Sequence, residues 1–451
     1  MLFKRKLYDV LVNWKKENGK TALLIEGARR IGKTTLVETF GKQAYKSCII
    51  IDFAKANPQI HEYFETLLDD LDTFFMLLSA TYKTPLYPRE SLIVFDEVQR
   101  FPRAREAIKY LVKDGRYDYI ETGSLISIQE NVANIVLPSE ERSVKMYPLD
   151  YEEFCTALGE EQLLPCIYHA FQTQTPLPTP LHQKAMRLFR LYLLLGGMPM
   201  SVAAFLESER NFLFADKEKR AILNLYREDI RKIRASLCEK VITIYDHVPT
   251  LLSQHDKKVN YQDLEQSARA NQYDAAFTWL SDAMLVNICM GCLDPNVGFA
   301  LTKKQGLLKC YFGDTGLLLS HTFSERELTD DHLYQQLLLD KLSINEGMFY
   351  ENIIAQMLTA KGHKLYFYKH YNPELHRSDM EIDFILTNES KLKYKIFPIE
   401  VKSSSTYSTK SLTRFIEKFK SRIGGAYIIH PKNLTQKEEI LCIPPYMTIC
   451  L

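Results

Sequence analysis

The chain has 451 residues, of which 46% are hydrophobic and 25% charged, and its formal net charge is +1. This composition is ordinary for a folded protein of about three domains, and the small net charge neither requires nor excludes nucleic acid, so any basic surface must be local. No apolar run has the form of a signal peptide or the length of a membrane span, so we expect a cytoplasmic protein that does not contact a membrane.

The nine cysteines are scattered along the chain, and their odd number favours reduced thiols over a disulfide framework. Cys289 and Cys292 form a single C-x-x-C. No second pair stands at zinc spacing, so we interpret these two residues as core or turn cysteines.

The first predicted site is the sequence GARRIGKTT, which fits the phosphate-loop pattern G-x-x-x-x-G-K-[ST]. An apolar strand at 21–26 should enter this loop, and a helix should begin at Lys33. Backbone amides and the helix N-terminus would then face the phosphates of ATP, with Lys33 bridging the β- and γ-phosphates and Thr34 binding Mg²⁺. The predicted nucleotide contacts are Gly27, Ala28, Arg29, Arg30, Ile31, Gly32, Lys33, Thr34 and Thr35.

The second predicted part of this site follows the apolar strand SLIVFD at 91–96. Such a strand is typical of a buried parallel sheet, whose ligands bind at the carboxyl ends of the strands. Asp96 and Glu97 stand at that end. We expect Asp96 to hold Mg²⁺ and Glu97 to orient and polarise the attacking water.

A third strand, YDYIETGS at 117–124, ends in polar residues that can reach a γ-phosphate. Ser124 is the first candidate for this sensing role and Thr122 the second; a turn serine is the alternative. Arg142 follows at a distance typical of a helix and loop. It is expected either to stabilise charge on the γ-phosphate of its own or a neighbouring subunit, or to be a surface arginine.

Seven motifs occur in one order along the chain: GARRIGKTTL, IVFDEVQR, ETGS, YPLDYEEF, LLLGGMP, YREDI and YFGDTGLL. Together they resemble a large group of prokaryotic AAA-type P-loop ATPases that carry a C-terminal domain of unknown function with a nuclease-like core. The resemblance covers nearly the whole chain and implies ATP binding and hydrolysis, without a settled biological role. Ala28 stands where this group usually has proline, and either residue fits a phosphate loop.

The middle of the chain has apolar residues at intervals of three and four, which predicts a helical lid at 151–240. A winged helix-turn-helix is predicted at 241–320, with helices at 261–270 and 273–285 followed by a β-hairpin. The second of these helices offers Asp274, Thr278 and Asp282 and no basic residue. A structural or protein-docking role is therefore favoured over reading of DNA bases.

After a predicted linker at 321–342, the segment 343–451 has the order of a restriction-endonuclease-like, PD-(D/E)xK domain. Glu351 lies on a predicted helix, Asp383 on a strand, and Glu400 and Lys402 on the next strand. Strand side chains alternate, so Glu400 and Lys402 share one face. The three carboxylates and the lysine could form a Mg²⁺ site that directs water at a phosphodiester, and Glu381 could add a further acid. A structural salt-bridge cluster is the alternative.

The predicted fold is thus α/β: a parallel P-loop sheet of AAA type at 1–150, a helical lid, a winged-helix-like domain and a nuclease-like C-terminal domain. The predicted function is Mg²⁺-dependent ATP hydrolysis that drives a conformational switch coupled to the C-terminal domain. Two alternatives are an ATP-regulated nuclease that cleaves DNA or RNA, and a nucleotide-dependent scaffold whose inactive nuclease fold docks a protein partner. Homo-oligomerisation is left open.

Overall fold

The computed structural model describes residues 1–123, 139–266, 268–296, 298–324, 331–338, 346–372, 377–387, 395–404 and 406–451. The chain forms two compact units. The amino unit comprises residues 2–147 with 282–284, and the carboxyl unit comprises 148–281 and 285–451 with Met1. The main division falls between residues 147 and 148.

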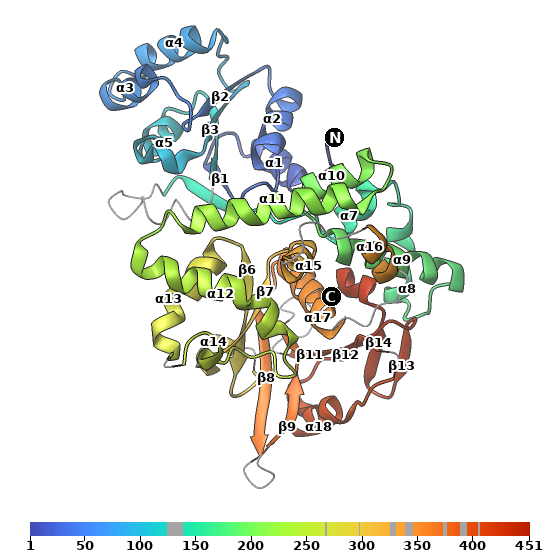
Figure 1. Ribbon diagram of the computed structural model, residues 1–451. Helices are drawn as coiled ribbons and strands as arrows, with labels where there is room; N and C mark the ends of the chain where they lie inside the picture. The colour runs from blue at the N-terminus through green and yellow to red at the C-terminus, as the bar shows by residue number, and fades with distance from the viewer. Residues whose placement is uncertain are drawn as a thin grey trace. The chain divides into compact units, whose positions relative to one another are not determined.

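The amino unit is built on one five-stranded sheet in which all neighbouring strands are parallel (Figure 1). The strand order is β2-β3-β4-β1-β5, which places β4 between β1 and β3. The predicted α/β fold with a parallel sheet is confirmed. The strands are β1 (Ala22–Glu26), β2 (Ser47–Asp52), β3 (Ser91–Asp96), β4 (Asp118–Gly123) and β5 (Glu141–Lys145).

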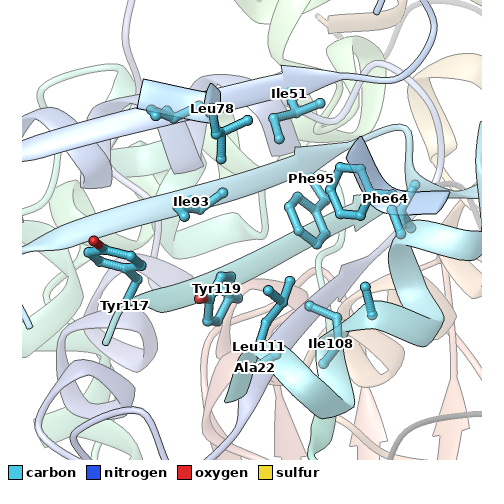
Figure 2. Close-up of a cluster of buried hydrophobic side chains, with 14 of the residues drawn as sticks. Ala22, Ile51, Phe64, Leu78, Ile93, Phe95, Ile108, Leu111, Tyr117 and Tyr119 are labelled. Carbon is cyan, nitrogen blue, oxygen red and sulfur yellow. The ribbon is translucent and has the colours of Figure 1, made fainter. Parts of the chain in front are cut away.

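Apolar side chains from this sheet and from its helices form a continuous core. Phe95 of β3 packs edge-on against Phe64, with ring centroids 5.4 Å apart, and Tyr119 of β4 belongs to the same cluster as Ile108 and Leu111 (Figure 2). Burial of each such side chain contributes about 1.5–3 kcal/mol, which fixes the strand ends on which the site is built. The helices are α1 (Leu7–Lys15), α2 (Lys33–Ala44), α3 (Pro58–Thr66), α4 (Leu71–Tyr82), α5 (Pro102–Asp114) and the 3₁₀ turn η1 (Val98–Arg100).

The interior of this sheet also contains an ionisable group. Glu121 of β4 is fully buried, and near it Arg105 of α5 makes a two-pronged ion pair with Glu141 of β5, with N···O distances of 2.8 and 2.6 Å. Burial, followed by repulsion from Glu141, raises the pKa of Glu121 well above its ordinary value. Glu121 therefore favours its neutral form in the folded protein.

Glu121→Gln is expected to raise the free energy of unfolding by about 1 kcal/mol, with a larger gain at pH 8 than at pH 5. The folded protein keeps a proton that the unfolded chain releases above the ordinary pKa, so native stability falls as pH rises through this window. Glutamine does not titrate, so the variant should not lose this stability as pH rises. Urea titrations at both pH values test this, with Glu62→Gln on the exposed face of α3 as control; equal gains at both values would contradict it.

The carboxyl unit begins with helices, as predicted for 151–240. Asp150 and Glu153 form a capping box at the start of α7, since Glu153 N–H donates to Asp150 Oδ1 (2.9 Å) and Asp150 N–H to Glu153 Oε2 (3.2 Å). The role of these helices as a lid stays a prediction. They are α7 (Tyr151–Ala157), α8 (Leu163–Gln172), α9 (Thr179–Leu195), α10 (Pro199–Glu207), α11 (Phe212–Ile230) and α12 (Ala235–Ser253).

Across the described residues, no single helix has both the length and the hydropathy of a membrane span. Only α9 and α10 taken together reach those values, and the two are bent by 115° at the break between them. Both helices bury apolar side chains, among them Phe189 of α9 and Phe205 of α10.

Two mixed sheets follow in the carboxyl unit. The first has the order β7-β6-β8-β9 and the second β10-β11-β12-β14-β13. The first sheet contains β6 (Val286–Cys292), β7 (Lys303–Phe312), β8 (Leu365–Asn372) and β9 (Arg377–Ile382). The second contains β10 (Phe384–Thr387), β11 (Ile396–Val401), β12 (Ala426–Ile429), β13 (Thr435–Lys437) and β14 (Ile440–Ile443).

The first sheet crosses a domain boundary that the sequence predicts. The β6–β7 hairpin belongs to the predicted winged helix, yet β6 also pairs in parallel with β8 of the predicted nuclease-like part. The segments 241–320 and 343–451 therefore share one sheet. The period-two pattern of a strand shows which face is buried but not which strand lies beside it.

Two local predictions differ from the structure. The helix expected at 261–270 is only a 3₁₀ turn, η2 (Tyr261–Asp263), and α13 (Ala270–Asp282) begins earlier than predicted. The expected linker at 321–342 contains the end of α15 and the helix α16, while 325–330 and 339–342 lie outside the described residues. The remaining elements are α14 (Phe299–Thr302), α15 (Thr315–Thr322), α16 (Asp331–Leu338), α17 (Glu346–Ala360), α18 (Lys410–Lys418), η3 (Lys420–Arg422) and η4 (Pro445–Cys450).

The motifs YPLDYEEF, LLLGGMP and YFGDTGLL meet inside the carboxyl unit. Gly197 N–H donates to Asp314 Oδ2 at 2.6 Å, and Leu149 N–H donates to Gly197 O at 2.7 Å. A Cβ atom on Gly316 would lie 2.3 Å from Leu195 O, so only glycine permits this approach. These glycines therefore serve close backbone packing.

Candidate nucleotide-binding site

The predicted phosphate loop connects the end of β1 to the start of α2. Gly32 caps α2 with φ 91°, a left-handed conformation that favours glycine. A Cβ atom on Gly27 would lie 2.5 Å from Met146 O. Both glycines are thus required by backbone geometry, and the loop delivers backbone amides to the amino end of α2.

Lys33 is the first helical residue, and its ammonium group folds back onto the loop. Its Nζ donates to Gly27 O at 2.8 Å and to Ala28 O at 3.0 Å, and the residue is 7% exposed. Burial lowers the pKa of Lys33 to about 8, although the carboxylates of Glu97 and Asp96 act in the opposite direction. The two carbonyl oxygens accept hydrogen bonds that phosphate oxygens could accept instead.

Oxygen-bearing side chains from the first turn of α2 and from the end of β4 meet at Asp96, the last residue of β3. Thr34 Oγ1 lies 3.1 and 3.2 Å from the two carboxylate oxygens of Asp96, and the Thr122 hydroxyl donates to Asp96 Oδ1. Thr122 reaches this position because β4 lies between β1 and β3. Hydroxyl and carboxylate oxygens are the ligands that Mg²⁺ prefers, so these residues fit the ion that a nucleotide would bring.

Glu97 directly follows β3 and has a left-handed backbone, with φ 55° and ψ 43°. Non-glycine residues adopt this conformation rarely and often at functional sites. Gln99, which is 4% exposed, donates from Nε2 to Glu97 Oε2 at 2.5 Å. Gln99 was not predicted from the sequence, where the only signal was an amide two residues after the acid in DEVQR.

A second unpredicted residue is Arg5, which lies far from the loop in sequence. Its guanidinium donates to Ile31 O in the loop at 2.9 Å and to Tyr147 O at 2.5 Å. Arg5 is 8% exposed, so these bonds are shielded from water. A buried guanidinium thus joins the phosphate loop to the last residue of the amino unit's main segment.

Of the other two predicted catalytic residues, Ser124 lies outside the described residues and Arg142 lies away from the phosphate loop. Thr122, the second candidate after Ser124, is therefore the one seen at the site. Arg142 lies on β5 opposite Leu23, near the start of β1, and pairs with Glu17 at 3.1 Å. The structure does not bring Arg142 to the loop of its own subunit, because the loop follows the other end of β1; a role in a neighbouring subunit stays a prediction.

The predicted carboxylates of the C-terminal segment also come together, but around an unpredicted lysine. Lys309 Nζ lies 3.1 Å from Glu381, 3.4 Å from Asp383 and 3.7 Å from Glu351. Burial alone would lower the pKa of Lys309, yet these carboxylates outweigh it and raise that pKa. Within the part of the chain that the structure describes, no group of three or more acidic, histidine or cysteine side chains is arranged to hold a metal ion.

Glu400 and Lys402 form the other predicted part of this cluster. Lys402 Nζ lies 2.7 Å from Glu400 Oε1, as expected for side chains on one face of β11. Burial raises the pKa of Glu400 to about 7, against the attraction of Lys402. The residues present therefore fit ammonium groups rather than a divalent cation, and the predicted nuclease site has no support in this geometry.

Family models match three segments of the chain. Residues 19–155 match an AAA domain family. Residues 186–327 match a domain of unknown function (DUF8612), and residues 346–446 match another (DUF4143). No curated protein matches the chain.

Solved structures that match the chain include a Walker-type ATPase of Pyrococcus abyssi, at 15% identity and a TM-score of 0.42, covering 71% of this chain and 96% of that chain. Cdc6p of Pyrobaculum aerophilum gives 14% identity and a TM-score of 0.25, with coverage of 74% and 93%. With TM-scores this low, the assignment depends on the family match and on the site geometry. Over residues 19–155 the chain is similar to the AAA domain family.

Proposed function

We propose that the amino unit binds ATP together with Mg²⁺ and hydrolyses it. The observation that carries this proposal is the meeting of Thr34, Asp96 and Thr122 at one sheet edge, beside Lys33. These side chains come from the first turn of α2 and from the ends of β3 and β4. Ligands of parallel α/β sheets bind at this edge.

Each residue has a role that its position supports. Loop amides and Lys33 would hold the β- and γ-phosphates, and Thr34 and Asp96 would hold Mg²⁺, which neutralises charge on the phosphate oxygens when bound. Glu97 would orient the attacking water and accept its proton, with its carboxylate held by Gln99. Thr122 would report the state of the metal through its bond to Asp96.

We further propose that the nucleotide state changes the conformation of the chain. Arg5 supports this, because it bonds both to Ile31 in the loop and to Tyr147, where the chain leaves the amino unit. A loop that rearranges around a γ-phosphate would move one of the two carbonyls that Arg5 holds. The sequence suggests two consequences of this change, docking of a protein partner or cleavage of nucleic acid. Docking is favoured, because the predicted nuclease carboxylates surround the ammonium group of Lys309.

Removal of Mg²⁺ tests the proposed function. ATP turnover is expected to fall at least about a hundredfold in excess EDTA, and similarly in Asp96→Asn, because charge on the transferred phosphoryl group is no longer neutralised. Phosphate release at saturating ATP measures both effects. Asp69→Asn, at an exposed position outside the site, is the control. Turnover that is indifferent to both EDTA and Asp96→Asn would refute the assignment.

A further inference from the structure

The carboxyl unit contains a buried group of carboxylates centred on one lysine. Lys309 projects from β7 and is 1% exposed. Its three acidic partners come from three other places: Glu351 from α17, Glu381 from β9, and Asp383 from the junction of β9 and β10. An ammonium group at this position contacts every acid that the sequence suggests for the C-terminal metal site except Glu400.

Further donors complete the cluster. Lys257 lies 2.5 Å from Glu351 Oε1, and the Tyr311 hydroxyl donates to Glu351 Oε2 at 3.0 Å. Lys369 lies 3.3 Å from Glu381, and Val401 N–H donates to Asp383 Oδ2 at 2.9 Å. Lys402 pairs with Glu400.

The charges of this cluster are therefore matched within the chain. Lys369 also pairs with Asp256 at 2.6 Å, and Asp256 with Lys258 at 3.3 Å, so five carboxylates face five ammonium groups: Glu351, Glu381, Asp383, Glu400 and Asp256 against Lys257, Lys309, Lys369, Lys402 and Lys258. A Mg²⁺ ion needs several oxygen ligands about 2.0–2.1 Å away in an octahedral arrangement. Lys309 Nζ stands between those oxygens, and its charge would repel a divalent cation in a poorly solvated site.

We propose that the ammonium group of Lys309 is the resident cation of this cluster, so that the carboxyl unit takes up no divalent cation there and does not cleave phosphodiesters through it. The cluster instead joins the β6–β7 hairpin to α17 and β9. This inference concerns the carboxyl unit alone and does not depend on ATP hydrolysis.

Titration of full-length protein with Mn²⁺ in the absence of nucleotide tests this proposal. An Asp96→Asn background removes the carboxylate of the ATP site from the measurement. We expect no saturable binding of Mn²⁺ in this background. Lys309→Met is expected to create a saturable Mn²⁺ site, at least about tenfold tighter than any residual binding in the background, because the acids lose their internal cation. Adding Asp383→Asn should abolish the new site, and Lys432→Met, at an exposed lysine, should create none.

Removal of a buried charge partner can prevent folding, so circular dichroism and gel filtration of Lys309→Met accompany the titration. A second comparison needs no Lys309 variant: Asp383→Asn and Glu400→Gln should leave the Mn²⁺ titration of the Asp96→Asn background unchanged. Mn²⁺ binding that either variant abolishes would overturn the proposal. So would cleavage of DNA or RNA in Mg²⁺ or Mn²⁺ that disappears in Asp383→Asn.

Discussion

Replacing Lys33 by alanine is expected to abolish detectable ATP turnover and to weaken ATP binding roughly a hundredfold. Lys33 Nζ is a buried cation at the loop, and its present partners, Gly27 O and Ala28 O, are neutral carbonyls that phosphate oxygens can replace. Loss of charge-assisted hydrogen bonds of this kind costs about 3 kcal/mol, which corresponds to that factor. Fluorescent-nucleotide titration and phosphate release measure the two effects.

The matched control for Lys33→Ala is Lys42→Ala, an exposed lysine on the same helix α2. It should leave binding and turnover unchanged. If Lys33→Ala retained wild-type affinity for Mg²⁺–ATP while folding normally, the phosphate-loop interpretation would be abandoned.

The same lysine gives binding a pH dependence. The pKa of Lys33 is lowered to about 8 by burial, and phosphates favour the charged form. ATP affinity should therefore be full below pH 8 and should decline as pH rises above it, since the amine must then gain a proton on binding. In Lys33→Ala this decline should be absent.

Replacing Glu97 by glutamine should lower kcat by about 10²–10³ while ATP still binds, because the amide cannot accept a proton from water. The Glu97 carboxylate accepts from Gln99, whereas Lys33 donates to Gly27 O and Ala28 O and Thr34 to Asp96. Single-turnover kinetics and nucleotide titration separate the two effects. Glu62→Gln on α3 serves as control.

A wild-type kcat in Glu97→Gln would indicate that another group is the general base. A variant that lost ATP binding as severely as turnover would instead assign Glu97 to nucleotide binding. Because the ATP-bound state should accumulate in Glu97→Gln, this variant is also suited to capture of a protein partner by the carboxyl unit.

The sequence alone predicts the loop, its lysine and the acidic strand end. Each of these features is a short contiguous pattern. The roles of Gly32, Lys33 and Asp96 depend on local backbone conformation and on the helix or strand beside them in the sequence. A parallel sheet follows from buried apolar strands that alternate with helices. These local signals needed no knowledge of distant contacts.

Only the tertiary structure shows that Thr122 contacts Asp96, that Arg5 holds Ile31, and that Lys309 stands among the predicted metal ligands. It also shows that β6 pairs with β8 across a predicted domain boundary. Each of these features joins segments that are distant in sequence. Strand order and the partner of a buried charge depend on which surfaces pack together in space, and a residue pattern along one strand or helix does not encode that choice.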